Sequence, residues 1–379
     1  MAFVYNTDDL IRPDMASSVL GIKGIGPKKE QTLIDAGYRT ADDLAHADFY
    51  DVASLPGFGM ATAYRIWEAL GRRIDCPPMK EVTDTESVDV VIENKVIHPW
   101  REHRSKKGKE IPTAPSDFEV ERTTVWSFPS RGDWASHTPQ YRGNWAPEVV
   151  RNIIELYSKP GDTVLDPMVG GGTTPVECLL TGRNSISVDV NPGAVSITRD
   201  RLDLPESMLD GIPETRHRTY VGDVRNLNGI PDESIDLVAT HPPYVNIISY
   251  APHVNGDLSQ FDSYDIFFRE FSRGVSEMMR VLRPGGFCTI LIGDTHNRSH
   301  FVPVSTRMML EFLSQGFVLK EDIIKREWNC ESDRSLGKYA GADFLLTMHE
   351  HLFVFEKPDG DGKPLRNSSI SFFDDVLKA

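Results

Sequence analysis

Four consecutive residues, His241-Pro242-Pro243-Tyr244, combine groups able to hold a planar molecule that carries an amino group. They follow the apolar run Ile235–Ala239 and Thr240, which predicts a buried strand. Because two prolines cannot continue a central strand, the chain must turn out at the carboxyl end of that strand, where open α/β sheets place their ligands. Proline carbonyls accept hydrogen bonds, and the tyrosine ring offers a flat face. The stretch therefore predicts a nucleobase site, although a plain proline turn beside a half-buried tyrosine gives the same pattern.

A glycine-rich turn is the second stretch with chemical meaning. Gly170-Gly171-Gly172 follows a β-branched run ending in Asp166 and opens a helical pattern over Thr173–Leu180. Glycines at such a turn allow the backbone to approach a ligand closely. The next predicted strand ends in Asp189, about twenty residues later, where nucleotide-binding folds place an acid on ribose hydroxyls. A third strand ends in Asp223, which suits an adenine amino group.

The order of these motifs resembles that of the S-adenosylmethionine-dependent amino-methyltransferases that act on DNA, the adenine-N6 and cytosine-N4 enzymes. In that family a strand-loop of the form Asp-Pro-Phe-x-Gly-x-Gly-Thr-Thr binds the cofactor, and a strand ending in (Asp/Asn/Ser)-Pro-Pro-Tyr holds the target base. The corresponding stretches here are Asp166–Thr174 and His241–Tyr244. Tyr141–Trp145, ahead of the glycine turn, is similar to the family's additional cofactor motif. The resemblance covers residues from about 124 to 358.

The resemblance implies a Rossmann-like class I methyltransferase fold, an α/β architecture with a mostly parallel seven-stranded sheet. It also implies a catalytic group made of His241, Pro242, Pro243 and Tyr244, in which the Pro242 carbonyl and residue 241 accept the amino hydrogens and Tyr244 stacks on a base extruded from the duplex. S-adenosylmethionine would contact the additional motif and the strand ends. The implied cofactor-binding residues are Tyr141, Arg142, Asn144, Trp145, Asp166, Pro167, Gly170, Gly172, Thr173, Thr174, Asp189, Asp223 and Thr240.

Residue 241 departs from the family pattern, which has Asp, Asn or Ser at this place. A neutral imidazole can still accept one hydrogen bond, whereas an imidazolium cannot. We therefore expect activity to fall below the pKa of His241, and a flat rate profile from about pH 5 to 8 would argue against this role. The alternative is that His241 caps the turn while the Pro242 carbonyl acts alone. Cytosine N4 is favoured over adenine N6 as the target only because an acid is absent.

Residues 17–73 repeat a glycine hairpin followed by a helical run. The hairpins are Gly24-Ile25-Gly26 and Gly57-Phe58-Gly59. Such hairpins direct backbone N–H groups outward at a helix N-terminus, where they hold an anionic oxygen. The segment resembles a tandem helix-hairpin-helix module, which binds the DNA backbone without sequence preference; a protein–protein module is the alternative. The implied DNA-binding residues are Lys23, Gly24, Gly26, Lys28, Gly57, Gly59 and Arg65.

Composition excludes several classes of protein. The 379 residues are 40% hydrophobic and 26% charged, which is typical of a globular chain with two or three domains. A net charge of −15 argues against indiscriminate coating of nucleic acid, although not against a nucleic-acid enzyme with a local basic groove. No apolar run approaches the roughly 18 residues that span a bilayer, and the N-terminus has no secretory pattern.

Cysteine and histidine spacing predicts no metal site. The four cysteines lie far apart, and His349-Glu350-His351 has no third ligand in view. A reducing, cytoplasmic compartment is the expectation.

These patterns divide the chain into a helix-hairpin-helix domain (1–75), a linker or extension (76–122), a methyltransferase domain (123–358) and a tail (359–379). The leading interpretation is a site-specific DNA amino-methyltransferase of restriction-modification or epigenetic type. Double-stranded DNA is its expected partner, a companion restriction endonuclease is an option, and no membrane is involved. One alternative is an RNA amino-methyltransferase, because tRNA guanine-N2 enzymes also use a Pro-Pro-Tyr turn. Another is a non-catalytic DNA-binding protein with a degenerate core.

Overall fold

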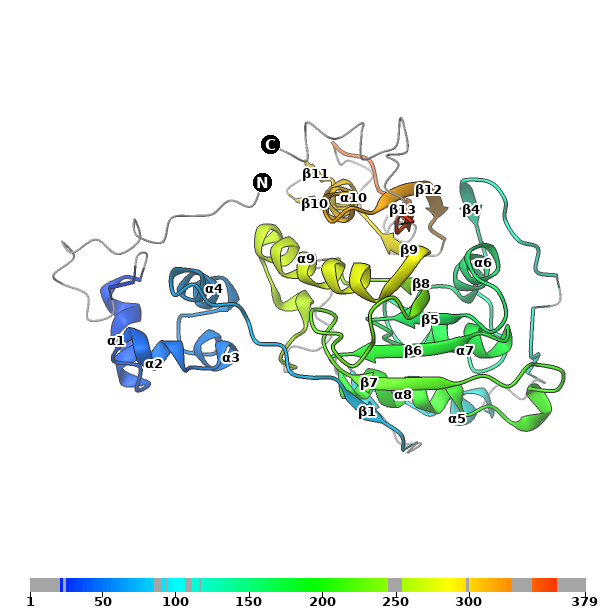
Figure 1. Ribbon diagram of the computed structural model, residues 1–379, viewed down its shortest axis with the longest axis horizontal. Helices are drawn as coiled ribbons and strands as arrows, with labels where there is room; N and C mark the ends of the chain where they lie inside the picture. The colour runs from blue at the N-terminus through cyan, green and yellow to red at the C-terminus, as the bar shows by residue number, and fades with distance from the viewer. Residues whose placement is uncertain are drawn as a thin grey trace.

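The computed structural model describes residues 21–22, 25–84, 90–92, 95–105, 111–115, 117–244, 254–297, 300–328 and 343–359. Figure 1 shows a group of short helices near the N-terminus beside a larger body built on one sheet. None of the helices in these ranges is long and apolar enough to cross a membrane.

The N-terminal group consists of α1 (Pro27–Asp35), α2 (Ala41–Ala45), α3 (Phe49–Ala53) and α4 (Met60–Ala69). Pro27 occupies the first turn of α1, where its missing N–H costs nothing. Thr40 caps α2 in a capping box with Asp43, and Asp48 caps α3. Short helices gain most of their stability from a shared core. That core holds Leu33, Leu44, Val52, Ile66 and Trp67, all at most 1% exposed.

The body is organised on a nine-stranded sheet with the order β1-β7-β6-β5-β8-β9-β13-β12-β4. The five strands from β7 to β9 in that order are parallel, and β13 runs antiparallel to both β9 and β12. The expected mostly parallel seven-stranded sheet is thus confirmed, and edge strands β1 and β4 enlarge it. The strands are β1 (Lys80–Val82), β4 (Val125–Ser127), β5 (Thr163–Asp166), β6 (Asn184–Asp189), β7 (His217–Val221), β8 (Ile235–Thr240), β9 (Leu282–Ile292), β12 (Val318–Arg326) and β13 (His349–Glu356).

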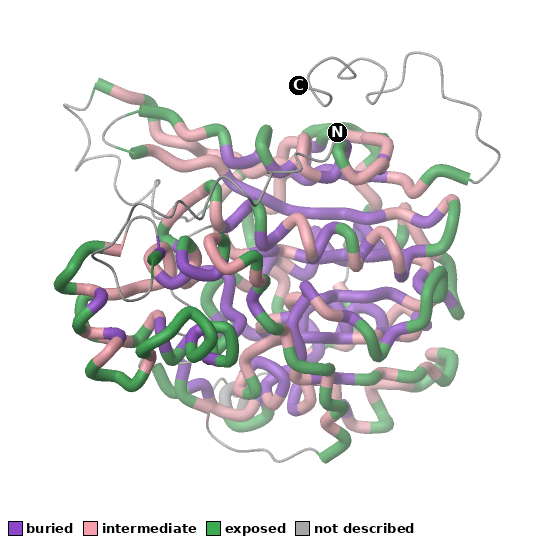
Figure 2. Tube along the Cα trace, turned by 60° about the vertical axis from the view of Figure 1, so that its left-hand side comes forward, coloured by how far each residue is buried: buried purple, intermediate pink, exposed green. Residues whose placement is uncertain are grey.

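Alternating side chains bury both faces of this sheet. Val164 and Leu237 belong to one apolar cluster, whereas their neighbours Leu165 and Val238 belong to another. Because successive residues of a strand point to opposite faces, the two clusters lie on opposite sides of the sheet. One face is covered by α6 (Pro147–Tyr157) and α7 (Thr173–Leu180), and the other by α9 (Tyr264–Val281) and α10 (Val304–Ser314). In Figure 2 the central strands are accordingly buried along most of their length.

Smaller elements complete the body. They are β2 (Val90–Ile92), β3 (Lys95–Ile97), α5 (Trp100–Ser105), α8 (Pro192–Leu202), η2 (Glu206–Met208), η3 (Leu258–Gln260), β10 (Thr295–Asn297) and β11 (His300–Val302). The described parts of residues 76–122 dock against the body. Ile92 and Ile97 of the β2–β3 hairpin share a cluster with Ala194 and Ile197 of α8.

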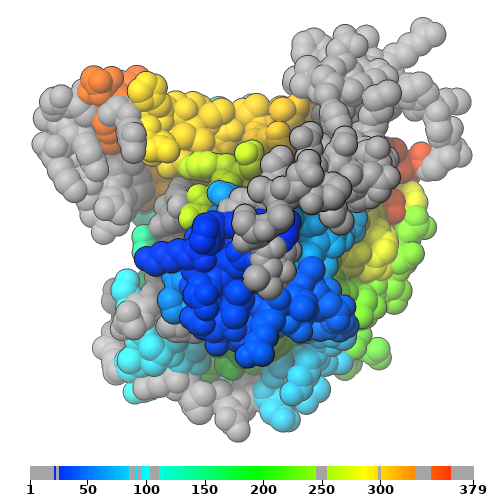
Figure 3. All heavy atoms as spheres, turned by 90° about the vertical axis from the view of Figure 1, so that its left-hand side faces the viewer, coloured from blue at the N-terminus to red at the C-terminus, as the bar shows by residue number. Residues whose placement is uncertain are grey.

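The helical module packs beside the carboxyl edge of the sheet. Tyr64 of α4 meets Phe261 edge-on with ring centroids 6.4 Å apart, and Arg269 pairs with Glu68 at 2.7 Å. The apolar core of the module is continuous with the cluster on the α9 face. Figure 3 shows the module lying against the body on this side. Both parts of the chain therefore border the edge where a parallel sheet presents its ligand site.

Candidate active site

The carboxyl ends of β5, β6, β7 and β8 open into one pocket. It contains about 760 Å³ of space free of protein atoms, its open mouth included. Its lining joins the Tyr141–Trp145 motif, the glycine turn, the acids at the ends of β5, β6 and β7, and the corner after β8. The lining residues predicted from the sequence are Tyr141, Asn144, Trp145, Asp166, Pro167, Gly170, Asp189, Asp223, His241 and Pro243.

The glycine turn is packed too tightly for side chains. Gly170 and Gly172 adopt φ of +51° and +78°, in the left-handed region. A Cβ on Gly170 would lie 3.0 Å from the Tyr141 ring. The Gly170 N–H donates to Asp189 Oδ2 at 2.9 Å, and the Asn191 N–H donates to Oδ1 of the same carboxylate at 2.9 Å. Asp189 therefore ties the turn after β5 to the end of β6.

Asp166 is the buried polar centre of the pocket floor. It accepts hydrogen bonds from the Thr174 hydroxyl at 2.6 Å and from the Thr240 hydroxyl at 2.9 Å. Burial raises the pKa of Asp166 to about 7 and that of Asp189 to about 6. Thr174 and Thr240 thus stand behind Asp166 instead of lining the pocket.

Three other predicted cofactor residues also lie outside the lining. Thr173 is buried with its hydroxyl 2.5 Å from the Asn144 side chain, and Gly172 packs against Thr198. The exposed Arg142 lies outside the pocket lining. These residues shape the pocket from behind or flank it.

The charge of the lining selects among cofactors. Four carboxyl groups line the pocket, from Asp166, Asp189, Asp223 and Asp257, and the described lining includes neither lysine nor arginine. Acidic walls disfavour a cofactor that carries phosphates and favour one with positive charge, hydroxyls and amines. S-adenosylmethionine has a sulfonium, an ammonium, ribose hydroxyls and an adenine amine, so the residues present fit it.

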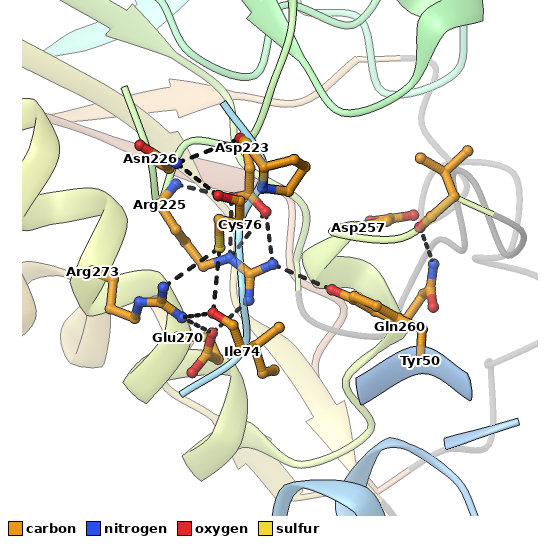
Figure 4. A network of polar contacts seen from close by, with 12 residues as sticks. Tyr50, Ile74, Cys76, Asp223, Arg225, Asn226, Asp257, Gln260, Glu270 and Arg273 are labelled. Carbon is orange, nitrogen blue, oxygen red and sulfur yellow. Dashed lines mark hydrogen bonds and ion pairs between the residues drawn. The ribbon is translucent and has the colours of Figure 1, made fainter. Parts of the chain in front are cut away.

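Asp223 is clamped by Arg225, a residue that the sequence reading missed. Arg225 Nη2 lies 2.7 Å from Asp223 Oδ2, and the Arg225 N–H donates to Oδ1 at 2.9 Å. The same guanidinium reaches Glu270 at 2.5 Å and the hydroxyl of Tyr50, in α3 of the helical module, at 3.3 Å (Figure 4). Through Tyr50, the helical module therefore contacts Arg225, which in turn contacts Asp223 in the pocket lining.

His241 lies between two aromatic rings at the mouth side of β8. Its ring centroid is 5.9 Å from that of Trp145 and 5.3 Å from that of Tyr244. Burial lowers the pKa of His241 to about 4. The imidazole is consequently neutral above about pH 5. A flat profile of kcat between about pH 5 and 8, measured at saturating cofactor, is therefore what a neutral His241 predicts. This corrects our expectation that such a profile would argue against the residue.

Of the other three residues of the corner after β8, only one lines the pocket. Pro243 lines the pocket, whereas Pro242 is buried outside the lining. The ring of Tyr244 lies 3.0 Å from the position that a Cβ on Gly293 would occupy. Its hydroxyl contacts His241 and Glu350. Tyr244 is thus packed behind the histidine and lies outside the pocket lining.

The starts of α1 and α4, which follow the two glycine hairpins, lie side by side. The Lys29 ammonium, in the first turn of α1, donates to the Thr62 hydroxyl in the first turn of α4 at 2.8 Å. Gly26 and Gly59 cap these two helices without a side-chain hydrogen bond, unlike the capped starts of α2 and α3. Lys28, Gly57 and Arg65 are exposed, and Lys23 and Gly24 lie outside the described residues.

Two further parts of the site lie outside the motifs that the sequence predicts. Gly256–Leu258 also lines the pocket, and a Cβ on Gly256 would lie 2.9 Å from a carboxylate oxygen of Asp223. Glu350, the middle residue of His349-Glu350-His351, contacts the Tyr244 hydroxyl. Within the described residues no group of three or more His, Cys, Asp or Glu side chains could hold a metal ion. No sequence pattern around Glu350 indicates this contact, because its contacts are with residues of other elements far away in the chain.

Comparison with known proteins gives two family matches. Residues 80–200 and 235–372 match a DNA methylase family, and residues 16–72 match a SAM-like helix-hairpin-helix tandem. The chain is 32% identical over 82 residues to the type II methyltransferase M.MjaII of Methanocaldococcus jannaschii, covering 20% of this chain and 16% of that protein. It is 26% identical over 161 residues to the type II methyltransferase M.MthZI of Methanothermobacter thermautotrophicus, covering 38% and 45%.

Among solved structures, the Thermus thermophilus protein TTHA0409 in complex with S-adenosyl-L-methionine is 26% identical, with a TM-score of 0.28 over 38% of this chain and 56% of that one. The chain spans less than half the length of the two curated relatives named above.

Proposed function

The chain belongs to the DNA methylase family, and from that premise we propose that it is a site-specific DNA methyltransferase. It transfers a methyl group from S-adenosylmethionine to an exocyclic amino group of a flipped base. The observation that carries the proposal is the pocket lined both by the glycine turn and by the corner at His241 and Pro243. Direct displacement needs the reacting atoms about 3–3.5 Å apart, and a single cavity bordered by both loops suits that requirement.

The acids of the pocket would hold the cofactor. S-adenosylmethionine supplies a methyl group already activated on a sulfonium, so the protein has to position and stabilise it and needs no nucleophile of its own. Asp166 and Asp189 balance the positive charge of the cofactor, and Asp189 can accept from hydroxyls while it holds the Gly170 N–H. Tyr141 and Trp145 are buried beside this carboxylate pair and exclude water from it.

His241 would act on the methyl acceptor. An aryl amine delocalises its lone pair into the ring, which makes it a poor nucleophile. An acceptor on one of its hydrogens draws the nitrogen towards a tetrahedral arrangement and aims the lone pair at the methyl group. His241 can be that acceptor because burial keeps the imidazole neutral, with a pKa of about 4.

The helical module would grip the DNA backbone. The open helix starts at Gly26 and Gly59 offer backbone N–H groups to phosphate oxygens, and the exposed Lys28 and Arg65 add positive charge. The module borders the carboxyl edge of the sheet, so DNA held by the hairpins would pass near the pocket.

We favour cytosine N4 over adenine N6 as the target because residue 241 is not an acid. A companion restriction endonuclease is part of the proposal, since two relatives are type II methyltransferases.

Nucleoside mass spectrometry tests the proposal. DNA and tRNA are purified from cells that express the chain and from cells that express His241→Leu, which removes the acceptor but keeps an apolar side chain of similar volume. We expect N4-methylcytosine in DNA from the first cells and its loss in the second. N6-methyladenine would change the base but keep the reaction, and a methylated base confined to tRNA would replace DNA with RNA as substrate. No methylated base in either nucleic acid would refute the enzyme.

A further inference from the structure

One side of the cofactor pocket is a short segment ahead of α9, residues 254–261, called here the wall segment. Gly256, Asp257 and Leu258 of this segment line the pocket. A Cβ on Gly256 would lie 2.9 Å from Asp223 Oδ2, so the wall segment lies directly against the acid that follows β7. Any movement of this segment therefore changes the shape of the pocket.

The helical module contacts the wall segment near both of its ends. Tyr64 of α4 meets the ring of Phe261 edge-on, with centroids 6.4 Å apart. Tyr50 of α3 accepts a hydrogen bond at its hydroxyl from the backbone of Gly256. Between these two contacts, Leu258 is 4% exposed and belongs to the apolar cluster that includes the core of the module. The module thus supports the pocket from behind, although no residue of α3 or α4 lines it.

The Tyr50 hydroxyl also completes the hydrogen bonding of Arg225 (Figure 4). The Arg225 side chain is fully buried, and its Nη1 donates to Glu270 at 2.5 Å. Nη2 has two hydrogens, and it donates to Asp223 Oδ2 at 2.7 Å and to the Tyr50 hydroxyl at 3.3 Å. Burial raises the pKa of Tyr50, so the hydroxyl stays neutral. One neutral hydroxyl of the module therefore joins the wall segment to the guanidinium that holds Asp223.

Loss of this hydroxyl would leave two buried donors without their acceptor, one on Arg225 and one on the backbone of Gly256. A buried N–H without a partner carries the full cost of its desolvation. The chain can relieve that cost only if the guanidinium or the wall segment moves towards water, and either movement displaces lining of the pocket. Only a fraction of the molecules then has the binding-competent pocket, and the apparent affinity for a ligand falls in proportion to that fraction.

We propose that Tyr50 is a positioning residue for the cofactor, which acts through Gly256 and Arg225 to hold the wall segment and Asp223 in place. The helical module is then part of the cofactor site as well as the part that grips DNA. Because coupling between two sites is reciprocal, S-adenosylmethionine must in turn stabilise the docking of α3. The inference rests on the proposed function, which assigns this pocket to S-adenosylmethionine.

Titration calorimetry on the full chain tests the effect on the cofactor without any reaction. Tyr50→Phe keeps the ring and removes the hydroxyl, and we expect it to weaken the binding of S-adenosylmethionine about tenfold, or about 1.4 kcal/mol. Glu68→Ala is the control, because it breaks the exposed ion pair with Arg269 in the same interface, outside the pocket lining. It should change the affinity less than about twofold. Unchanged affinity in Tyr50→Phe, or an equal loss in the control, overturns the proposal and leaves the proposed function standing.

Hydrogen exchange gives a readout that does not depend on the cofactor. In the ligand-free chain Tyr50→Phe should speed exchange in the wall segment, and Glu68→Ala should not. Saturating S-adenosylmethionine should slow exchange in α3 of the wild type, and much less in Tyr50→Phe. A wall segment that exchanges at the wild-type rate in Tyr50→Phe, or an α3 unaffected by the cofactor in the wild type, contradicts the proposal. If the wild type binds no S-adenosylmethionine, the proposed function fails, and exchange in the ligand-free chain still decides whether Tyr50 holds the wall segment.

Discussion

Two glycines with the same φ angle have opposite surroundings in this protein. Gly172, in the cofactor turn, and Gly57, in the second hairpin, both have φ of +78°. A Cβ on Gly172 would lie 2.9 Å from the Thr198 hydroxyl and 3.0 Å from the Thr198 Cα, whereas a Cβ on Gly57 would meet no described atom within 4 Å. The first glycine allows α7 and α8 to pack closely. The second leaves a backbone surface open, as a site for an external group requires.

The cofactor pocket and the hairpin surface also differ in charge. The pocket is lined by four acids, and the hairpin surface carries the exposed Lys28 and Arg65. The acidic lining favours a positively charged small molecule, and the basic surface is the one that we propose for a polyanion. A net charge of −15 conceals this division, because the sum over the chain says nothing about either local field.

The largest predicted effect is the difference in stability between alanine substitutions at Gly172 and at Gly57. Gly172→Ala combines left-handed strain with a clash against the backbone of α8, and we expect it to lower the free energy of unfolding by about 3–4 kcal/mol. Gly57→Ala adds strain alone and should cost about 1–2 kcal/mol. Urea denaturation of both variants measures the difference. Equal losses would show that close packing at Gly172 contributes little and would remove the contrast.

Breaking the hairpin surface should weaken DNA binding and leave the pocket intact. We expect Lys28→Ala combined with Arg65→Ala to lower duplex affinity about tenfold and to reduce the slope of log affinity against log salt by about 2. The affinity for S-adenosylmethionine should not change. Arg39→Ala is the control, because Arg39 is an exposed cation of the same module beyond the C-terminal end of α1. An equal loss in the control would point to a general charge effect.

The sequence predicted the parts of the site that depend on local chemistry. The prolines after β8 stop a buried strand, and the glycines after β5 permit a tight turn, so both loops could be located from residue types alone. The family resemblance drawn from those motifs is confirmed, as is the tandem helix-hairpin-helix module. The expected parallel sheet is confirmed as well.

What the sequence could not predict depends on distant pairing. The edge strands β1 and β4 have three residues each, too short for a recognisable period. Glu350 reaches Tyr244 only because the register of β13 on β9 brings its first residues to the carboxyl edge. The resemblance implies Thr240 as a cofactor residue, but it does not show that the Thr240 hydroxyl donates to the buried Asp166. The contact of Arg225 with Tyr50 joins residues that are far apart in the sequence, so no local pattern indicates it.

The acids of the pocket should give cofactor binding a pH dependence that DNA binding by the hairpins lacks. Burial raises the pKa of Asp166 to about 7 and of Asp189 to about 6, so both are partly protonated at pH 6 to 7 in the free protein. A positively charged ligand prefers the ionised forms, and its affinity should therefore rise with pH up to about pH 8. Each acid can contribute a rise of up to about tenfold for every pH unit below its own pKa. Titration calorimetry measures this rise. Asp166→Asn should remove the part of the rise near pH 7, the pKa of Asp166. A wild-type affinity that does not change with pH would contradict the acidic pocket as the cofactor site.

The smallest effect concerns the helix starts that are closed by side chains. Thr40 accepts from the Asp43 N–H at 3.1 Å and so satisfies the start of α2, whereas the starts of α1 and α4 have only glycine caps. Thr40→Ala should lower the free energy of unfolding by about 1 kcal/mol, as the loss of an N-cap usually does. Duplex affinity should stay within about twofold of the wild type, because the Asp43 N–H is held by Thr40 in the wild type and contributes no phosphate contact that the substitution could remove. If Thr40→Ala weakened DNA binding as much as the hairpin variants, the capped and the open helix starts would be equivalent towards DNA, and the module would bind by a surface other than its hairpins.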